Sequence, residues 1–405
     1  DIIFEGNRIQ PKSAADTIRL GIGMVHQHFM LVDSLRVYEN VILGMEPKNG
    51  IMIDKEKAIQ AVEETAKKYN LKIDPMAVVG DLSVSQKQKV EILKVLLRGA
   101  KLLILDEPTA VLTPQETDEL FEQLLLLKKN DHTIIFISHK IREVMQICDN
   151  ITVLRAGRTV GSIPVANATE EDISRFMVGR DVILKMNKKP AEFGDTLLKV
   201  TDLTYENKEG RKLLDHVSFS LKKGQILGIA GVEGNGQNEL AEAIFGFYSG
   251  VKGSILFDGK EILGKSIRAI RDDGISYIPE DRIKTGAAGN ISLWGNMIAD
   301  IIDSPLLKKH GLLNYKNIHE RADKLISDFG VLCQNDNQPI SMLSGGNMQK
   351  VVVAREFSSD PKLLIANQPT RGIDVGANEF IWKKIIEQRD AGKGVILISA
   401  DLNEI

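Results

Sequence analysis

The chain has 405 residues, too many for one ordinary domain and enough for two or three. Hydrophobic residues at 43% and charged residues at 26% exclude wholesale disorder, and a net charge of −3 offers no basic field for nucleic acid. Two cysteines are too few for a disulfide framework or a cysteine metal cluster and suit a reducing compartment. No apolar run approaches the roughly 18 residues that span a bilayer, so we expect any membrane link to come through a partner.

In the first half of the chain, short apolar runs alternate with helical patterns. Three runs rich in Leu, Ile and Val are typical of buried parallel strands, and they lie at 102–105, 134–138 and 151–154. Ser83 and Thr113 stand where helices begin, and Thr113 is followed by Pro at the first helical position. Residues 54–69 predict another helix, which we assign to a small helical insert.

The second half begins after a polar stretch with Lys and Pro that we interpret as a linker. Residues 225–230 predict a strand that leads into a glycine-rich loop at 231–236, and a helix starts near Gln237. Residues 318–329 predict a second helical insert. A strand, a glycine loop, a helix and then further alternating elements indicate an α/β fold with a mainly parallel sheet.

The sequence contains a tandem repeat. LLILDEPT at 102–109 returns as LLIANQPT at 363–370, an offset of 261 residues (363 − 102), and two further motifs return at the same offset. The earlier motif FEG at 4–6 returns as FDG at 257–259, an offset of 253 (257 − 4), so the second copy carries extra residues between its early and late motifs. Three motifs in fixed order at one spacing make chance an unlikely origin.

The register of the repeat predicts the domain organisation. The predicted parts are a first copy at 1–180, a linker at 181–195 and a second copy at 196–405. The counterpart of Thr196 falls near position −57 (196 − 253), so we expect the first copy to lack its N-terminal part, including its glycine loop. The second copy stops soon after its last motif. The 405 residues are therefore predicted to be an internal piece of a longer chain.

Asp106 and Glu107 end a hydrophobic strand. An aspartate there can hold Mg²⁺ through water, since Mg²⁺ takes one or two carboxylates plus phosphate oxygens, and Glu107 can polarise an attacking water as general base. His139 ends the next strand, where it can contact a γ-phosphate. An isolated Asp-Glu pair is more often a solvated turn, but the Pro-Thr that follows, the repeat partner and His139 favour the functional interpretation.

The second copy keeps the outline of such a site without its chemistry. Its loop has the spacing Gly231-x₄-Gly236, which lets backbone N–H groups turn toward a phosphate at a helix N-terminus. A phosphate-binding loop needs Lys and then Ser or Thr after the last glycine, and this chain has neither. We therefore predict a degenerate site that does not hydrolyse nucleotide. Its residues are Gly231, Gly234, Asn235, Gly236, Gln237, Asn238, Asn367, Gln368 and Ala400, the last three at the positions of Asp106, Glu107 and His139.

A second anion-binding pattern precedes a predicted helix in the second copy. It consists of Ser344, Gly345, Gly346 and Asn347, which offer a hydroxyl, glycine amides and a helix N-terminus. Alone, the pattern is more often a plain N-capped turn. Its counterpart in the first copy, 83–86, has side chains at both glycine positions, which hinder close approach of a phosphate.

In this order, the motifs resemble those of the ATP-binding cassette (ABC) ATPases over essentially the whole chain. The resemblance implies two tandem P-loop NTPase cassettes, each with a mainly parallel sheet and a small helical subdomain. It implies that Asp106 and Glu107 are the Walker B pair and that His139 is the switch histidine. It also implies that Gln27 is the Q-loop glutamine and that Gln27 binds Mg²⁺ together with Asp106. Residues 344–347 become the ATP-binding signature loop. ATP and Mg²⁺ are the implied cofactors.

Cassettes of this family pair head to tail, and each ATP lies between one copy's Walker motifs and the other's signature loop. The resemblance therefore implies one competent composite site, which joins the Walker B pair of the first copy to the signature of the second. The other composite site is degenerate on both sides. Without the first Walker A loop, we expect the 405 residues by themselves to hydrolyse little or no ATP.

Among twin cassettes, the chain is most similar to the ATPases of simple-sugar and nucleoside importers, on PEDR at 279–282 and PTRGIDVGA at 369–377. GMVHQHF at 23–29 and the loss of the acidic pair at 367–368 favour the nucleoside group. The implied partners are integral-membrane permease subunits, which dock on the helical insert and on the segment after Gln27, and indirectly an extracytoplasmic substrate-binding protein. The implied location is peripheral, on the cytoplasmic face of the membrane, and no nucleic-acid partner is expected.

Three other functions stay open. One is an importer ATPase for sugars of the ribose or galactose type. Another is a soluble twin-cassette ATPase that acts on ribosomes or DNA, although such proteins usually carry two intact sites and a long charged linker or coiled coil. The third is a nucleotide-binding regulatory scaffold.

Overall fold

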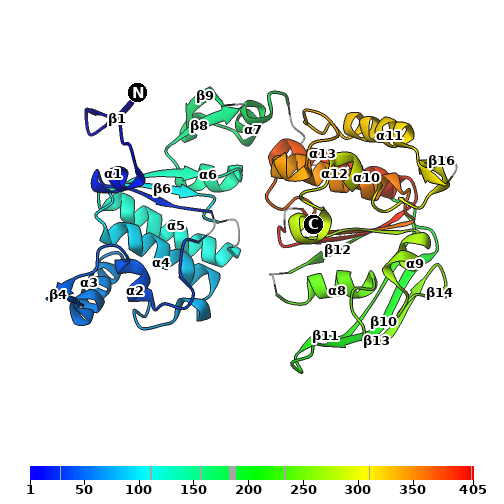
Figure 1. The fold of residues 1–405 in the computed structure, drawn as a ribbon, viewed down its shortest axis with the longest axis horizontal. Coiled ribbons are helices and arrows are strands. Elements are labelled where there is room, and N and C mark those ends of the chain that lie inside the picture. The colour runs from blue at the N-terminus through cyan, green and yellow to red at the C-terminus, as the bar shows by residue number, and fades with distance from the viewer. Residues whose placement is uncertain are drawn as a thin grey trace. The chain divides into compact units, whose positions relative to one another are not determined.

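A computed structural model describes residues 1–27, 29–109, 112–155, 157–181, 188–231, 234–309, 311–402 and 404–405. The chain divides into two compact units, residues 1–180 and 181–405, which are drawn in Figure 1. Three parts of the sequence motifs fall outside the described residues: His28, residues 232–233 of the glycine loop, and residues 182–187 of the predicted linker.

The first unit is built around a parallel sheet in the order β3-β6-β7, which comprises Ile22–Val25, Leu102–Asp106 and Thr133–Ile137. Its other strands are paired in two-stranded antiparallel sheets: β1 (Ile2–Phe4) with β2 (Asn7–Ile9), β4 (Lys48–Asn49) with β5 (Met52–Ile53), and β8 (Asn150–Arg155) with β9 (Arg158–Pro164). Its helices are α1 (Ala14–Arg19), α2 (Val37–Ile42), α3 (Lys55–Lys68), α4 (Val84–Leu97), α5 (Pro114–Lys129), α6 (Ile141–Ile147) and α7 (Glu170–Val178).

Helix starts in the first unit lie where the sequence predicts them. Ser83 caps α4: its hydroxyl accepts the Gln86 N–H, and the Gln86 side chain accepts the Ser83 N–H. Thr113 and Glu116 form the same reciprocal pair at the start of α5, and Pro114 occupies the first helical position. Each pair satisfies two backbone donors that no helical carbonyl reaches, so both predicted caps are confirmed.

The central sheet of the first unit is less buried than predicted. Alternate residues such as Leu103 and Leu105 are fully buried in one core with α2, α3, α4 and α5. Residues of β7 that point the other way stay open to solvent, with Ile135 46% and Ile137 44% exposed. Ile134 and Phe136, on the face that meets this core, are partly buried against it.

Residues 151–154 do not form a buried parallel strand, and that prediction is wrong. They belong to β8, which pairs antiparallel with β9 in a separate two-stranded sheet. The connection is short and includes Gly157 in the left-handed region, at a φ of +75°. Ile151 and Val153 point inward while the residues between them are exposed, which is the alternation of an antiparallel strand with one solvated face.

The second unit contains a parallel sheet in the order β12-β19-β18-β15, formed by Ile226–Ala230, Gly394–Ser399, Leu363–Asn367 and Ile275–Ile278. A four-stranded antiparallel sheet runs β11-β10-β13-β14, formed by Lys212–Lys222, Thr196–Glu206, Lys252–Phe257 and Lys260–Glu261. A hairpin joins β16 (Lys308–Lys309) and β17 (Leu312–Leu313). The helices are α8 (Gln237–Ile244), α9 (Ile267–Asp272), α10 (Leu293–Ile298), α11 (Tyr315–Asp328), α12 (Gly345–Ser358) and α13 (Val375–Asp390).

Two cores sandwich the parallel sheet of the second unit. Leu364 and Ala366 of β18 pack in the core that holds α12 and α13, while Leu363 and Ile365 pack in the core that holds α8. Figure 1 shows α12 and α13 on one side of this sheet and α8 on the other. All residues of β18 and β19 are buried, because helices cover both faces.

Candidate functional site

In the first unit, three strands deliver polar residues to one edge of the sheet. Gln27 follows β3, Glu107 follows β6 and His139 follows β7, and parallel neighbours end on the same side. Glu107 has a φ of +45°, an uncommon conformation for a residue with a side chain, and its N–H donates to the Ile137 carbonyl at 2.9 Å. The chain therefore turns sharply at Glu107 while it stays attached to the neighbouring strand.

The Glu107 carboxylate is the centre of the cluster. The Gln27 side-chain amide donates to one of its oxygens, with Nε2 and Oε2 2.8 Å apart, and His139 Nδ1 lies 2.9 Å from the other, Oε1. The Glu107 and His139 side chains are each about one quarter exposed. The hydrogen bond from His139 lowers the pKa of the Glu107 carboxyl, while partial burial opposes that shift. The structure thus brings together three of the predicted residues, and Asp106 directly precedes them at the end of β6.

A buried contact between the segment that follows Glu107 and helix α6 was not predicted from the sequence. Thr109, 1% exposed, donates through its hydroxyl to Glu143 Oε2 at 2.5 Å, and Lys140 Nζ lies 3.0 Å from the other Glu143 oxygen. Lys140 also donates to the Thr109 carbonyl at 2.9 Å. These bonds tie the segment after Glu107 to the start of α6. The signal in the sequence is a lysine and a glutamate three positions apart, directly after His139.

The second unit repeats the backbone of this cluster with neutral side chains. Gln368 has a φ of +50°, and its N–H donates to the Ile398 carbonyl at 2.8 Å, as Glu107 does to Ile137. Asn367 donates to the Asn238 side-chain oxygen at 2.8 Å, and the Ala400 N–H donates to Gln368 Oε1 at 3.3 Å. The sharp turn is preserved, but no carboxylate stands at the positions that correspond to Asp106 and Glu107.

The side chain of Gln237 lies against the backbone of the glycine loop in the second unit. A Cβ atom on Gly231 would lie 2.1 Å from the Gln237 side-chain nitrogen, so this amide rests directly on the loop backbone. The Asn235 N–H donates to Gln237 Oε1 at 3.1 Å. Gly236 has a φ of +93° at the start of α8, which a side chain would strain. Where a phosphate loop has a lysine that reaches the phosphates, this loop has an amide that bonds to the loop's own backbone.

The two units differ in their fit to Mg²⁺ and a nucleotide phosphate. In the first unit the polar side chains are two carboxylates, an amide and an imidazole, and carboxylate oxygens are what Mg²⁺ prefers. In the second unit the positions of Asp106, Glu107 and His139 hold Asn367, Gln368 and Ala400, and Asn367 is bonded to the Asn238 amide. The position of Gln27 holds a carboxylate that is paired with an arginine. The residues of the first unit fit Mg²⁺, and those of the second do not. Among the described residues, no group of three His, Cys, Asp or Glu side chains is placed to hold a metal by itself.

The predicted signature residues form the start of α12. The Ser344 side chain accepts from the Asn347 N–H as the N-cap of the helix, and Asn347 Nδ2 donates to Ser344 Oγ at 2.9 Å. A Cβ atom on Gly345 would lie 2.8 Å from the Arg282 guanidinium, and one on Gly346 would lie 3.2 Å from an Asp374 carboxylate oxygen. A side chain at either glycine would therefore displace a neighbouring side chain in the same unit.

Glu280 takes the place of Gln27 in the second unit, at the offset of 253 (280 − 27). It forms an ion pair with Arg371. Arg282 then donates to the carbonyls of Arg371 and Gly372 at 2.6 and 3.2 Å. PEDR and PTRGIDVGA, the two motifs that suggested a subgroup in the sequence, thus contact each other. The glutamate at the position of Gln27 was not predicted from the sequence.

No helix within the described ranges is long and apolar enough to cross a membrane. A family model described as "ABC transporter" matches residues 1–110 and 214–371. The chain resembles one solved structure, a nucleotide-free ATP-binding cassette from an ABC transporter, at 25% identity and a TM-score of 0.44, over 52% of this chain and 83% of that one.

Curated relatives align along almost the whole chain. The nucleoside import ATP-binding protein NupA of Lactococcus lactis subsp. cremoris (strain MG1363) is 42% identical, over 98% of this chain and 78% of the relative. The guanosine import ATP-binding protein NupO of Bacillus subtilis (strain 168) is 43% identical, over 100% and 79%. The ribose import ATP-binding protein RbsA of Clostridium tetani (strain Massachusetts / E88) is 36% identical, over 100% and 79%. With these relatives and a family match over more than half of its residues, the chain belongs to the ABC transporter family.

Proposed function

We propose that this ABC protein is the ATP-hydrolysing subunit of an importer for nucleosides, and that its first cassette carries the hydrolytic chemistry. The observation that carries the proposal is the Glu107 carboxylate, held by Gln27 on one oxygen and by His139 on the other. Two relatives above 40% identity are named for import of nucleosides and guanosine, which supports the substrate class. Two sequence features that favour the same class are the segment 23–29 and the amides at 367–368.

In this proposal Glu107 accepts a proton from the water that attacks the γ-phosphate. The hydrogen bond from His139 favours the ionised carboxylate, which is the form that can accept the proton. Gln27 fixes the direction of the same carboxylate. Asp106 and Gln27 would hold Mg²⁺, which, when bound, neutralises charge on the phosphate oxygens. Thr109, Lys140 and Glu143 are positioning residues, because they hold the segment that carries Glu107.

The second cassette is proposed to be unfit for hydrolysis. Asn367 and Gln368 cannot accept a proton from water at neutral pH, and the Gln237 side chain covers the loop instead of reaching a phosphate. ATP turnover is instead proposed to need the signature residues 344–347 together with the first cassette's Asp106, Glu107 and His139. The tandem arrangement is proposed to be a first cassette at 1–180, a linker at 181–195 and a second cassette at 196–405.

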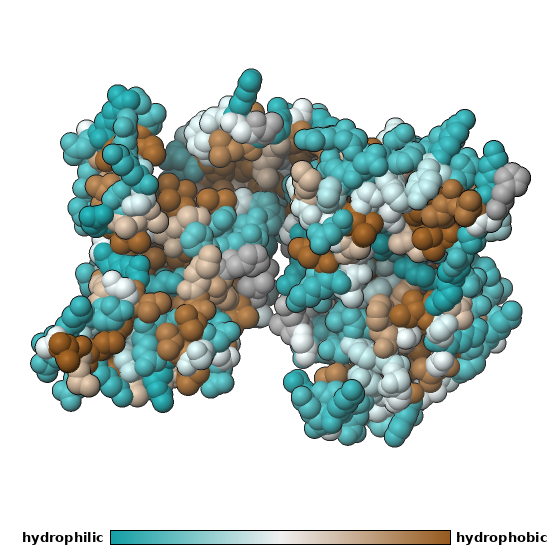
Figure 2. All heavy atoms as spheres, in the orientation of Figure 1, coloured by the Kyte–Doolittle hydropathy of each residue, from teal (hydrophilic) through white to brown (hydrophobic). Residues whose placement is uncertain are grey.

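The proposed direct partners are integral-membrane permease subunits. An extracytoplasmic substrate-binding protein is proposed as an indirect partner. The location is then peripheral, on the cytoplasmic face of the membrane. Exposed apolar hairpin tips support a docking role for the helical inserts: Ile51 and Met52 are 103% and 74% exposed in the first unit, and Leu312 is 76% exposed in the second. Figure 2 shows hydrophobic surface at the tip where Figure 1 labels β4.

Transport assays in cells test the substrate and the catalytic assignment together. Cells that express the full gene should take up labelled guanosine, and cells that lack it or carry Glu107→Gln should not. Labelled ribose serves as the matched substrate. Loss of ribose uptake with unchanged guanosine uptake would make this chain a sugar-importer subunit. Uptake that persists in the Glu107→Gln cells would remove Glu107 from its proposed role.

A further inference from the structure

A cavity of about 330 Å³ lies in the second unit between α11, the end of α12 and α13, away from the residues assigned to ATP. Leu325, Phe329 and Phe357 line it with apolar surface and are themselves buried. Pockets for small molecules usually measure about 300–1,000 Å³ and combine an apolar lining with a few polar groups. The cavity is large enough for a ligand with one ring.

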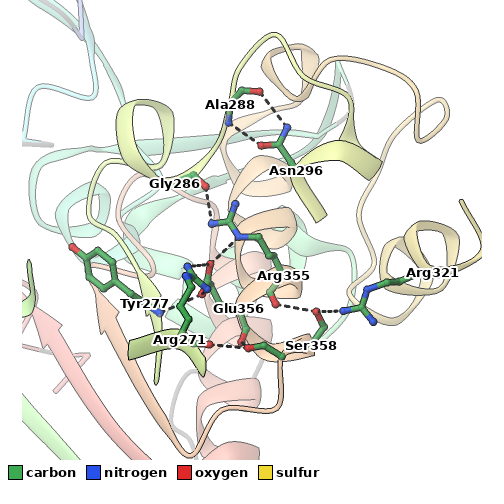
Figure 3. A network of polar contacts seen from close by, with 11 residues as sticks. Arg271, Tyr277, Gly286, Ala288, Asn296, Arg321, Arg355, Glu356 and Ser358 are labelled. Atoms are coloured by element: carbon green, nitrogen blue, oxygen red, sulfur yellow. Dashed lines mark hydrogen bonds and ion pairs between the residues drawn. The ribbon is translucent and has the colours of Figure 1, made fainter. Parts of the chain in front are cut away.

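Three basic side chains border this cavity: Arg321 and Lys324 from α11, and Lys384 from α13. Arg321 donates to the Ser358 hydroxyl at 2.8 Å, a contact that Figure 3 shows at the end of α12. Its Nε is buried and has no hydrogen-bond partner among the described residues. Lys384 stands over the Phe329 ring, with its nitrogen 5.6 Å from the ring centre.

Nearby carboxylates leave part of this positive charge uncompensated. Glu387 pairs with Lys384 at 2.9 Å, and Asp328 is the last residue of α11. The basic residues deeper in the unit are already occupied, since Arg271 donates to both oxygens of the buried Glu356, as Figure 3 shows. Lys324 is exposed and has no hydrogen bond or ion pair within the part of the chain that the structure describes. Arg321 and Lys324 are thus the donors available to an anion from solution.

The first unit shows that the fold itself does not require these charges. Helices α3 and α11 each have 14 residues and end before an aromatic residue, Tyr69 or Phe329. This alignment places Ala61 and Glu64 at the positions of Arg321 and Lys324. Helices α5 and α13 each have 16 residues, which places Gln123 at the position of Lys384. The repeat keeps the helices and lacks all three cations.

We propose that this cavity binds a small phosphate monoester that carries an apolar ring. The Arg321 guanidinium and the Lys324 ammonium hold the phosphate, because guanidinium and ammonium groups form strong charge-assisted bonds to it. Leu325, Phe329 and Phe357 receive the ring. This ligand site is separate from the ATP chemistry and does not rest on the transported substrate.

Calorimetric titration of the protein from its full gene with phenyl phosphate tests the proposal. We expect saturable binding, and at least tenfold weaker binding of both inorganic phosphate and benzyl alcohol, which each lack one half of the ligand. The variant Arg321→Ala/Lys384→Gln replaces two of the three cations with their counterparts from the first unit and should weaken phenyl phosphate binding at least tenfold. Lys324→Glu, at an exposed position, should do the same and covers the case in which the double variant fails to fold.

Lys316→Glu, with the same change of charge, is the matched control, since Lys316 lies on the same helix, is 82% exposed and does not line the cavity. It should leave the affinity unchanged. An equal loss for Lys316→Glu and Lys324→Glu would reduce the effect to general surface charge and overturn the proposal. Absence of saturable binding, or equal affinity for inorganic phosphate, would overturn it as well.

Discussion

At Glu107 one carboxylate serves two partners, and each of its oxygens has a different neighbour. Gln27 donates to Oε2 and His139 contacts Oε1, so that both the direction and the protonation state of the carboxylate are set by side chains from other strands. The same turn at Gln368 carries an amide, with its N–H bonded to the neighbouring strand in the same way. The two copies therefore share the backbone turn but differ in the chemistry of the side chain at that turn.

Glu107→Gln should lower ATP hydrolysis by about 10²- to 10⁴-fold and leave ATP binding in place. The amide keeps the shape of the side chain but cannot accept the proton of the attacking water. Steady-state turnover and binding of a fluorescent ATP analogue measure the two effects separately. Gln368→Glu is the control and should leave turnover unchanged, because Asn367, Gln237 and Ala400 remain. A doubled rate in that control would contradict the division of labour between the cassettes.

His139→Ala should raise the pKa of Glu107. The hydrogen bond from His139 lowers this pKa, and without it the opposing effect of burial remains. A lowered pKa contributes stability above the carboxyl's unfolded pKa, and this contribution is lost as pH falls through the folded pKa. The variant should therefore lose that contribution. A carboxylate ¹³C titration of both proteins measures the shift, and an unchanged or lower Glu107 pKa in the variant would contradict the assignment.

Among the elements, the starts of α4, α5 and α12 follow from local sequence, while their contacts do not. Ser83, Thr113 and Ser344 are recognisable N-caps because the partner of each lies three residues away. The bond from Thr109 to Glu143 spans 34 residues and depends on how two strands are paired. For the same reason, the apolar run at 151–154 reveals a strand but does not show whether its neighbour is parallel or antiparallel.

Gly345→Ala should lower the free energy of unfolding of the second unit by about 1–2 kcal/mol. The new Cβ would stand 2.8 Å from the Arg282 guanidinium, which must move and give up its bonds to the carbonyls of Arg371 and Gly372. Arg282→Ala removes the same bonds without the added methyl group. Both changes break the same contact between Arg282 and the two carbonyls. The double variant should therefore lose less free energy of unfolding than the sum of the losses of the two single variants. Denaturant unfolding measures all three, and additive losses would show that the two residues act independently.

At the scale of the whole chain, the tandem repeat explains which structural features could be predicted from the sequence. The amide substitutions at 367–368 follow from alignment of the chain with itself, while the parallel strands and the glycine loop follow from local composition and spacing. Contacts unique to one copy do not, because no repeat partner shows them: the Gln237 side chain that lies against Gly231 and the ion pair of Glu280 with Arg371 are two examples. Their chemistry depends on side-chain directions that neither spacing nor periodicity records.

The dependence of the first cassette on the signature of the second can be tested with one pair of substitutions. Gly346→Asp should sharply reduce ATPase and uptake rates, since an added carboxylate opposes a phosphate with an energy on the order of 4 kcal/mol at 4 Å and an effective dielectric constant of ~20. The new aspartate at position 346 would also lie close to the Asp374 carboxylate. The counterpart of Asp374 in the first unit is the neutral Thr113, so Ser85→Asp should be the milder change. Thermal unfolding of both variants separates a folding defect from lost turnover: Gly346→Asp should stay inactive at temperatures where it is folded. Equal losses of turnover in two folded variants would mean that both cassettes hydrolyse ATP, against the asymmetry that Asn367 and Gln368 indicate.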